Sequence, residues 1–112
     1  MPKGRSRNLL DLKPVRRVEW EVSDDRVILI APKFRNRTIQ NLFEKLSSAP
    51  NFRIKLDDYG SFVWRMCDGS FTVMEIIEAM ERKFEGSAEY LPERTIEFIR
   101  NLASGGFIEL IE

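Results

Sequence analysis

YGSFVWRMCDGSF, residues 59–71, is followed without a break by TVMEI, residues 72–76. The first segment has apolar residues at helical spacing and ends at the Asp-Gly pair 68–69, which is typical of a turn that stops a helix. The second segment opens with the pattern Thr-x-x-Glu, in which Thr72 and Glu75 each accept a hydrogen bond from the other's backbone amide. Two helices joined by a short turn are therefore predicted, and the rest of the chain is interpreted around this helix-turn-helix unit.

The sequence before this unit has the period-two pattern of β-strands. Residues 18–22, VEWEV, alternate apolar and acidic side chains, and residues 27–30, VILI, form a continuous apolar run. Residues 23–25 have the composition of a tight turn, so the two strands are expected to form a hairpin that stops at Pro32. Residues 52–56, FRIKL, alternate again and predict a third strand, which would lie at an edge of the sheet with unpaired backbone groups.

Three helices are expected after these strands. Caps and glycines give their approximate bounds: from Asp57 or Asp58 to about Cys67, from Thr72 to near Gly86, and from about Pro92 to Gly105. Residues 107–111 return as a terminal extended segment. The predicted fold class is α+β: a three-stranded antiparallel sheet, made of a β-hairpin plus a third edge strand, followed by three helices in an arrangement of winged helix-turn-helix type.

At 112 residues the chain has the length of one small domain. Residues 1–14 contain four basic residues and two prolines, and we expect them to form a flexible basic N-terminal arm. Residues 15–112 would form the folded domain, with an insertion at about residues 32–51. Within the insertion, residues 38–46 have helical spacing and predict a short helix.

Composition argues against the commonest catalytic and metal sites. The chain has one cysteine, Cys67, and no histidine, so it cannot form an internal disulfide, a Cys/His zinc site or a Cys-His catalytic pair. It has neither a GxGxxG run nor a P-loop, and its carboxylates lack EF-hand spacing. We therefore expect no enzymatic activity, metal or cofactor. Because no apolar run approaches roughly 20 residues and no secretory signal is present, we also expect a cytoplasmic protein without membrane contact.

The net charge of zero hides an uneven distribution. Residues 1–55 contain 13 Lys and Arg against 6 Asp and Glu, a balance of +7, whereas residues 56–112 contain 5 against 12, a balance of −7. Either the two sets pair with each other as solvated faces, or the basic half attracts an anionic partner while the acidic half repels nucleic acid.

Two functions compete for such a fold: DNA binding through the third helix, as in a winged-helix transcriptional regulator, and capture of an extended peptide at the open sheet edge. The two arginines of the third helix are offset by two glutamates within the acidic half, so nucleic-acid contact is disfavoured. The third strand, in contrast, carries Arg53 and Lys55 where they would meet acidic side chains of an added strand. A structural interaction domain, in which the insertion pairs with a partner or with a second copy, is a third alternative.

The residues resemble the coenzyme PQQ synthesis protein D (PqqD) family of peptide-recognition domains over about residues 15–111. The most specific part of the resemblance is the Cys-Asp-Gly turn followed by the Thr-Val-x-Glu-Ile helix start. The features that carry it are Leu56-Asp57, Gly60, Val63-Trp64, Cys67-Asp68-Gly69, Thr72-Val73, Ile76-Ile77, Phe98-Ile99, Leu102 and Gly106-Phe107-Ile108.

The resemblance implies a recognition element for ribosomally synthesised, post-translationally modified peptides. Such a protein is non-catalytic: it binds the leader segment of a precursor peptide and presents it to a modifying enzyme, often a radical S-adenosylmethionine (SAM) enzyme. In the family, the leader adds as a strand to the third β-strand and lies against the third helix. On this chain the peptide-binding groove would be walled by Arg53, Ile54, Lys55 and Leu56 on one side and by Arg94, Phe98 and Asn101 on the other. Because the strand half is basic, we expect an acidic leader.

Two segments depart from the family pattern. The linker at residues 32–51 is longer than is common in the family, so it would cover, extend or reshape the leader groove. The basic residues 1–8 are not explained by the resemblance. The exposed strand edges and the insertion also permit a strand-exchanged dimer.

Overall fold

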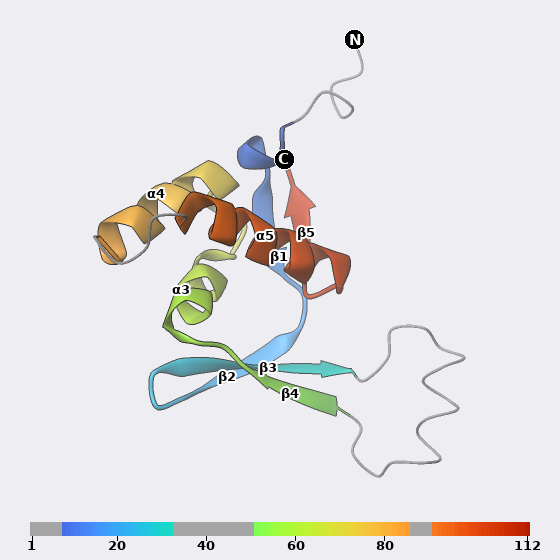
Figure 1. Cartoon of the computed structure of the whole chain (residues 1–112). Helices are drawn as coiled ribbons and strands as arrows, with labels where there is room; N and C mark the ends of the chain where they lie inside the picture. The colour runs from blue at the N-terminus through green and yellow to red at the C-terminus, as the bar shows by residue number, and fades with distance from the viewer. Residues whose placement is uncertain (1–7, 33–50, 86–90) are drawn as a thin grey trace.

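The computed structural model describes residues 8–32, 51–85 and 91–112. Figure 1 shows a three-stranded sheet on one side of the molecule, helices above it, and a pair of strands beside the helices. The elements are η1 (Leu9–Asp11), β1 (Lys13–Arg16), β2 (Glu19–Ser23), β3 (Arg26–Pro32), β4 (Asn51–Lys55), α3 (Asp58–Met66), α4 (Val73–Lys83), α5 (Leu91–Ser104) and β5 (Ile108–Ile111). The predicted α+β class is confirmed, with antiparallel strands and helices α3, α4 and α5. The short helix predicted at residues 38–46 lies outside the described residues.

The three-stranded sheet has the order β2-β3-β4, with antiparallel pairing throughout. Asp24 and Asp25 form the two-residue turn of the β2-β3 hairpin, and both have positive φ angles, 54° and 65°. Primed two-residue turns need such angles because their twist matches that of the strands, and Asp tolerates them better than most residues. The prediction of a hairpin with an added third strand is therefore confirmed.

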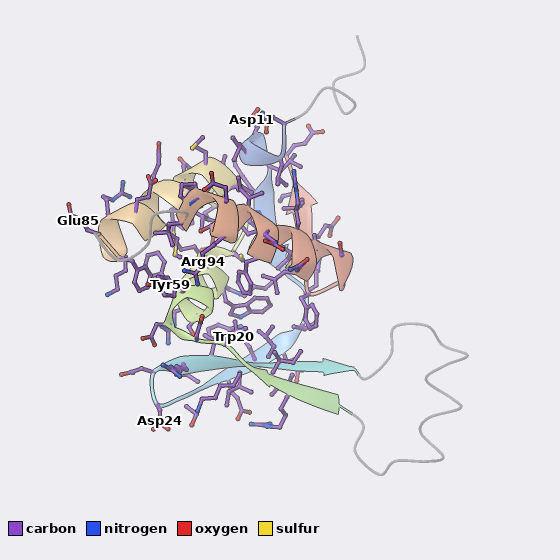
Figure 2. All side chains as sticks on the ribbon, viewed as in Figure 1. Asp11, Trp20, Asp24, Tyr59, Glu85 and Arg94 are labelled. Atoms are coloured by element: carbon purple, nitrogen blue, oxygen red, sulfur yellow. The ribbon has the colours of Figure 1, made fainter. Side chains whose placement is uncertain are left out.

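The sheet has one face toward the helices and one away from them. Leu29 pairs with Trp20 on one side and Ile54 on the other, and its side chain is 1% exposed against the core. Trp20 lies on the same face, between the sheet and the helices (Figure 2). Because side chains alternate along a strand, the neighbours of these residues point to the opposite face. This alternation decides which residues of β4 can face a bound molecule.

Strands β1 and β5 form a second, two-stranded sheet that the sequence analysis did not predict. Pro14 in β1 is fully buried, and Leu9 and Leu10 of η1 pack on the core. Residues 8–14, which their composition placed in a flexible arm, are thus part of the folded structure. Residues 1–7 lie outside the described residues, and their assignment to an arm stays a prediction.

The Cys67-Asp68-Gly69 turn docks on β1 through its backbone. The amide of Arg16 donates to the Cys67 carbonyl at 2.9 Å, and the amide of Gly69 donates to the Pro14 carbonyl at 2.9 Å. A third bond of 2.9 Å joins the Val73 amide, at the start of α4, to the Leu12 carbonyl. β1 therefore lies between β5 and the turn, which fixes the two helices that the turn connects.

The predicted caps of these helices are confirmed. Asp57 is the N-cap of α3 and accepts a hydrogen bond of 2.8 Å from the amide of Gly60. Thr72 and Glu75 form the reciprocal capping box at the start of α4, with bonds of 2.8 and 3.1 Å. α3, α4 and α5 then bury a common core with the sheet, which includes the fully buried Trp64, Leu29, Ile76, Met80, Ile99, Val27, Val63 and Val73. Within the part of the chain that the structure describes, no helix has the length and apolar character of a membrane span.

Replacement of Gly69 by alanine is expected to destabilise the fold. Gly69 has φ +86°, a left-handed conformation that side chains disfavour, and an added Cβ would lie 3.2 Å from Val15 Cγ2. Strain of this kind costs roughly 1–3 kcal/mol. Chemical denaturation of Gly69→Ala should show a loss of that size, whereas Ser70→Ala, at the exposed neighbouring residue, should stay close to the parent protein. Equal stability of Gly69→Ala and the parent would contradict the docked turn.

The Cys67 thiol should stay protonated and unreactive while the chain is folded. Burial raises its pKa from 9.0 to about 12, an effect that Arg16 opposes and Asp68 reinforces. Below pH 9 both the folded and the unfolded thiol are protonated, so this contribution to stability is fully present. Between pH 9 and about 12 only the unfolded thiol ionises, so the free energy of unfolding falls by up to about 1.4 kcal/mol per pH unit.

Two measurements check this prediction. Iodoacetamide at pH 8 should alkylate Cys67 rapidly only in denaturant, and Cys67→Ala should show a shallower decline of stability above pH 9 than the parent. Rapid alkylation of the native protein would show that the thiol is accessible.

Candidate functional site

One edge of β4 is open. The Leu56 amide donates to the Val27 carbonyl of β3 at 2.8 Å. Because alternate residues of an antiparallel strand bond to opposite neighbours, Ile54 also directs its backbone groups to β3, whereas Arg53 and Lys55 direct theirs outward. Within the described residues, no strand pairs with this outer edge.

The β3-β4 ladder ends at a buried hydroxyl group. The Val27 amide donates to Ser61 Oγ at 2.8 Å, and the Ser61 hydroxyl donates to the Leu56 carbonyl at 3.4 Å. Ser61 is 1% exposed and lies in the first turn of α3. It thus replaces the direct bond that would continue the ladder, and it ties the end of β4 to the start of α3.

The side chains of β4 divide between the two faces of the sheet. Ile54 pairs with Leu29 on the face toward the helices and is 36% exposed. Arg53 and Lys55 pair with Ile30 and Ile28 on the opposite face. Ile54 therefore faces the helices, whereas the side chains of Arg53 and Lys55 extend from the other face of β4.

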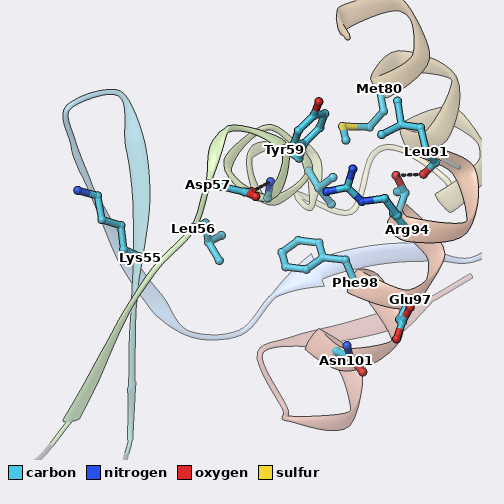
Figure 3. Close-up of a pocket in the computed structure, with 13 residues that line it drawn as sticks. Lys55, Leu56, Asp57, Tyr59, Met80, Leu91, Arg94, Glu97, Phe98 and Asn101 are labelled. Carbon is cyan, nitrogen blue, oxygen red and sulfur yellow. Dashed lines mark hydrogen bonds between the residues drawn. The ribbon is translucent and has the colours of Figure 1, made fainter. Parts of the chain in front are cut away.

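The two basic residues of β4 also differ in their partners. Arg53 forms an ion pair with Glu21 of β2, in which both side chains are about half exposed. For Lys55, no ion pair is found among the described residues, and its side chain points away from the helices (Figure 3).

A cavity of about 500 Å³ lies between β4, the start of α3 and α5. Of the predicted groove residues, it is lined by Lys55, Leu56, Arg94, Phe98 and Asn101, but not by Arg53 or Ile54. Figure 3 shows Leu56 and Phe98 facing each other, with Arg94 extended toward Tyr59. The structure thus brings the end of β4 and one face of α5 together at one cavity.

Gly60 allows the close approach of α5 to α3 at this cavity. A Cβ atom at Gly60 would lie 3.2 Å from Phe98 Cζ and 3.3 Å from Leu56 Cβ. The Phe98 ring occupies this space and is half-buried, while Leu56 beside it is 8% exposed. The absence of a side chain at residue 60 therefore shapes the floor of the cavity.

Comparison with known proteins identifies the family. A family model described as "Coenzyme PQQ synthesis protein D (PqqD)" matches residues 46–108, which is more than half of the chain. The chain belongs to the PqqD family. The matched range holds β4, the helices α3 to α5 and every residue that lines the cavity.

A curated relative of this PqqD-family chain is a "PqqA binding protein" from Methylococcus capsulatus. The two are 24% identical over 79 residues, which cover 70% of this chain and 66% of the relative. The match therefore spans just under two thirds of the relative's length. No solved structure matches the chain.

Several cavity residues of this PqqD-family chain were not predicted from sequence. Tyr59 packs against the core, and its ring centre also lies 4.9 Å from the Arg94 Cζ atom and 4.4 Å from the ring centre of Phe84. Helical spacing on α5 is a signal that could have found more of them, because Leu91, Thr95 and Phe98 recur every three or four residues. The unpredicted residues that line the cavity are Asp57, Tyr59, Gly60, Val63, Met80, Leu91, Thr95 and Glu97.

The chemistry of the cavity suits binding. The Thr95 hydroxyl donates to the Leu91 carbonyl at 2.8 Å, and Asp57 caps α3, so both polar groups have internal partners. Among the described residues, no group of three or more His, Cys, Asp or Glu side chains could hold a metal ion. What the site offers is an open strand edge, an apolar floor and the guanidinium of Arg94.

Gly60→Ala should alter the cavity more than it alters stability. The added methyl group must displace Phe98 or Leu56 by a few tenths of an ångström, whereas the gain in helix propensity of about 1 kcal/mol offsets much of the cost. The ring resonances of Phe98 and the methyl resonances of Leu56 should shift in NMR spectra, with a free energy of unfolding within about 1 kcal/mol of the parent. Ser104→Ala, at the exposed end of α5, is the control and should leave both sets unchanged. Unshifted Phe98 resonances in Gly60→Ala would contradict the close packing.

Proposed function

We propose that this protein is a non-catalytic recognition protein that binds the leader segment of a ribosomally synthesised precursor peptide by strand addition to β4. It presents the peptide to a modifying enzyme, for which a radical SAM enzyme is our candidate. The observation that carries the proposal is the open edge of β4 beside a cavity of about 500 Å³. Membership of the PqqD family and the name of the relative, a protein that binds PqqA, support a peptide as the ligand.

The ladder predicts the register of the added strand. Its backbone would bond to the outward N–H and C=O groups of Arg53 and Lys55. Peptide residues opposite these two would place their side chains on the outer face of the sheet, beside the two cations. Peptide residues opposite Ile54 and Leu56 would point into the cavity. A leader that alternates acidic and apolar residues fits both faces.

Most of the binding free energy should come from peptide side chains that enter the cavity. Each backbone hydrogen bond contributes roughly 0.5–1.5 kcal/mol net. Ordering the peptide backbone costs roughly 1–2 kcal/mol per residue, so the strand bonds about break even. Burial of an apolar peptide side chain against Leu56 and Phe98 contributes roughly 1.5–3 kcal/mol and therefore decides whether the peptide binds.

The proposal also covers the arrangement of the helices and the cellular location of the protein. We take α3, the turn at 67–69, α4 and α5 to be a helix-turn-helix of winged type, with the β2-β3 hairpin as the wing. The setting is the cytoplasm, where precursor peptides are made. Within the described residues, the cavity face of α5 carries Glu97 as well as Arg94, and this mixed charge supports a peptide rather than duplex DNA as the ligand.

Titration with candidate precursor peptides tests the function. Backbone amide signals of residues 53–56, together with the side chain of Phe98, should shift on binding of an acidic leader. Lys55→Glu should weaken that binding several-fold, because Lys55 meets acidic peptide side chains, whereas Arg100→Glu, on exposed α5 surface outside the cavity, should not.

Two outcomes would overturn the function. Shifts that avoid residues 53–56 would place the ligand elsewhere. Salt-sensitive binding of duplex DNA, with no response to any peptide, would support the alternative of a winged-helix transcriptional regulator.

A further inference from the structure

We propose that Arg94 binds one carboxylate side chain of the peptide on the helix-facing side of the added strand, and that Tyr59 is the positioning residue that holds Arg94 there. This rests on the proposed strand addition and specifies which side chains the site selects. Arg94 is exposed and lines the cavity, and no ion pair is found for it among the described residues. Its guanidinium is thus available to a ligand in the cavity, where Figure 3 shows it beside Tyr59.

The contact of Arg94 with the Tyr59 ring is compatible with accessible N–H donors. Its Cζ atom lies 4.9 Å from the centre of the Tyr59 ring. A guanidinium that contacts an aromatic ring through its planar face keeps its N–H groups around the rim, where a carboxylate can accept two parallel hydrogen bonds. The aromatic contact and an ion pair with a ligand therefore do not compete.

Tyr59 is itself held by a cluster of aromatic rings. Its ring centre lies 4.4 Å from that of Phe84 at the end of α4, and Phe62 meets Phe84 edge-on at 5.8 Å. This cluster restricts the ring that Arg94 rests on. Because an arginine side chain has much rotamer freedom, a fixed aromatic surface lowers the entropy that Arg94 loses when a carboxylate binds.

The other charged groups of the cavity do not serve as the partner of Arg94. Asp57 uses a carboxylate oxygen to cap α3 through the Gly60 amide at 2.8 Å. Glu97 lies about one turn further along α5, and no ion pair between it and Arg94 is found in the described part of the chain. A carboxylate from a peptide can therefore neutralise the charge of the Arg94 guanidinium in the cavity.

The placement of Arg94 predicts the position of the selected carboxylate in the peptide. Arg94 is on the helix side of β4, whereas the side chain of Lys55 is on the outer face of the sheet. A peptide residue that contacts Arg94 therefore lies on the same face of the added strand as the apolar residue that enters the cavity. A peptide residue that contacts Lys55 lies on the opposite face. The expected pattern is an acidic and an apolar residue two positions apart.

Synthetic peptides of alternating leucine and threonine provide the test. In such a strand the leucines face the cavity and the threonines face outward, so glutamate can replace either one leucine or one threonine. Each glutamate peptide is compared with its glutamine counterpart by calorimetry, on the parent protein and on Arg94→Gln, Lys55→Gln and the control Arg100→Gln.

Arg94→Gln should abolish the preference for glutamate over glutamine, roughly tenfold, when the residue replaces leucine. Lys55→Gln should affect only the peptides in which glutamate replaces threonine, and Arg100→Gln should affect neither. Two results with Arg94→Gln would overturn the assignment while leaving strand addition intact. One is loss of the glutamate preference at both the leucine and the threonine positions, and the other is retention of the preference at both. Failure of every peptide to shift the amides of residues 53–55 would overturn strand addition as well.

Variants of Tyr59 separate a positioning role from a structural one. Tyr59→Phe keeps the aromatic face and should keep the glutamate preference. Tyr59→Leu should reduce it several-fold, with a smaller effect on the glutamine peptide. Thermal unfolding of each variant shows whether the fold is retained. Equal preference in Tyr59→Leu and the parent, with both folded, would remove Tyr59 from the proposal.

Discussion

The docking of the Cys67-Asp68-Gly69 turn on β1 is the interaction on which the remaining structure depends. Three backbone hydrogen bonds of 2.9 Å tie residues 12, 14 and 16 to the turn and to the start of α4. Gly69 in this turn has φ +86°, and an added Cβ would lie 3.2 Å from Val15 Cγ2, so both the backbone conformation and the close contact favour glycine. Because the same β1 pairs with β5 on its other edge, one short strand joins the N-terminal segment, the helix-turn-helix and the C-terminus.

Helix α3 connects this anchored turn to the open edge of β4. At its C-terminal end, the Arg16 guanidinium donates to the carbonyls of Trp64 and Arg65, each at 3.0 Å, and so satisfies acceptors that a helix end leaves free. At its N-terminal end, Ser61 bonds both Val27 and Leu56. The helix is therefore fixed at both ends, and the position of β4 relative to α5 follows from it. The cavity depends on how α3 is held, although none of its lining residues belongs to the turn at residues 67–69 that anchors the helix.

Local chemistry could be predicted from the sequence, whereas non-local pairing could not. The Asp57 cap, the Thr72 capping box and the hairpin turn depend on residues within a few positions of one another, and all were predicted. The pairing of β1 with β5 joins residues almost a hundred positions apart. Lys13–Arg16 has no alternation of apolar and polar residues that would indicate a strand. Arg94, Phe98 and Asn101, which the family resemblance placed on one wall of the groove, recur at helical spacing on α5, and all three line the cavity.

Other features of the site also depend on contacts between residues that are distant in the sequence. The sequence places Arg53 and Lys55 on one face of a strand, but which face meets the helices is decided by Val27 and Leu29 on the neighbouring strand. Tyr59 packs against the core, in keeping with its helical spacing, but that spacing gives no sign that Arg94 would lie over its ring. Part of the charge of the basic half pairs with the acidic half. Arg17 pairs with Glu109 and Arg26 pairs with Asp58, and both pairs are exposed, so they contribute little to stability.

Arg53, which is paired with Glu21, and Lys55 affect how the open edge of β4 could pair with a second copy. Antiparallel association of two β4 edges through the backbone groups of Arg53 and Lys55, centred on Ile54, would place Arg53 of each chain opposite Lys55 of the other. Like charges directly opposite one another destabilise a strand pair, and the neighbouring registers bring Arg53 or Lys55 opposite itself. A strand with acidic residues at the same positions meets no such penalty. The charges of β4 therefore disfavour these registers of self-association, and they are compatible with the acidic strand that we propose as the ligand.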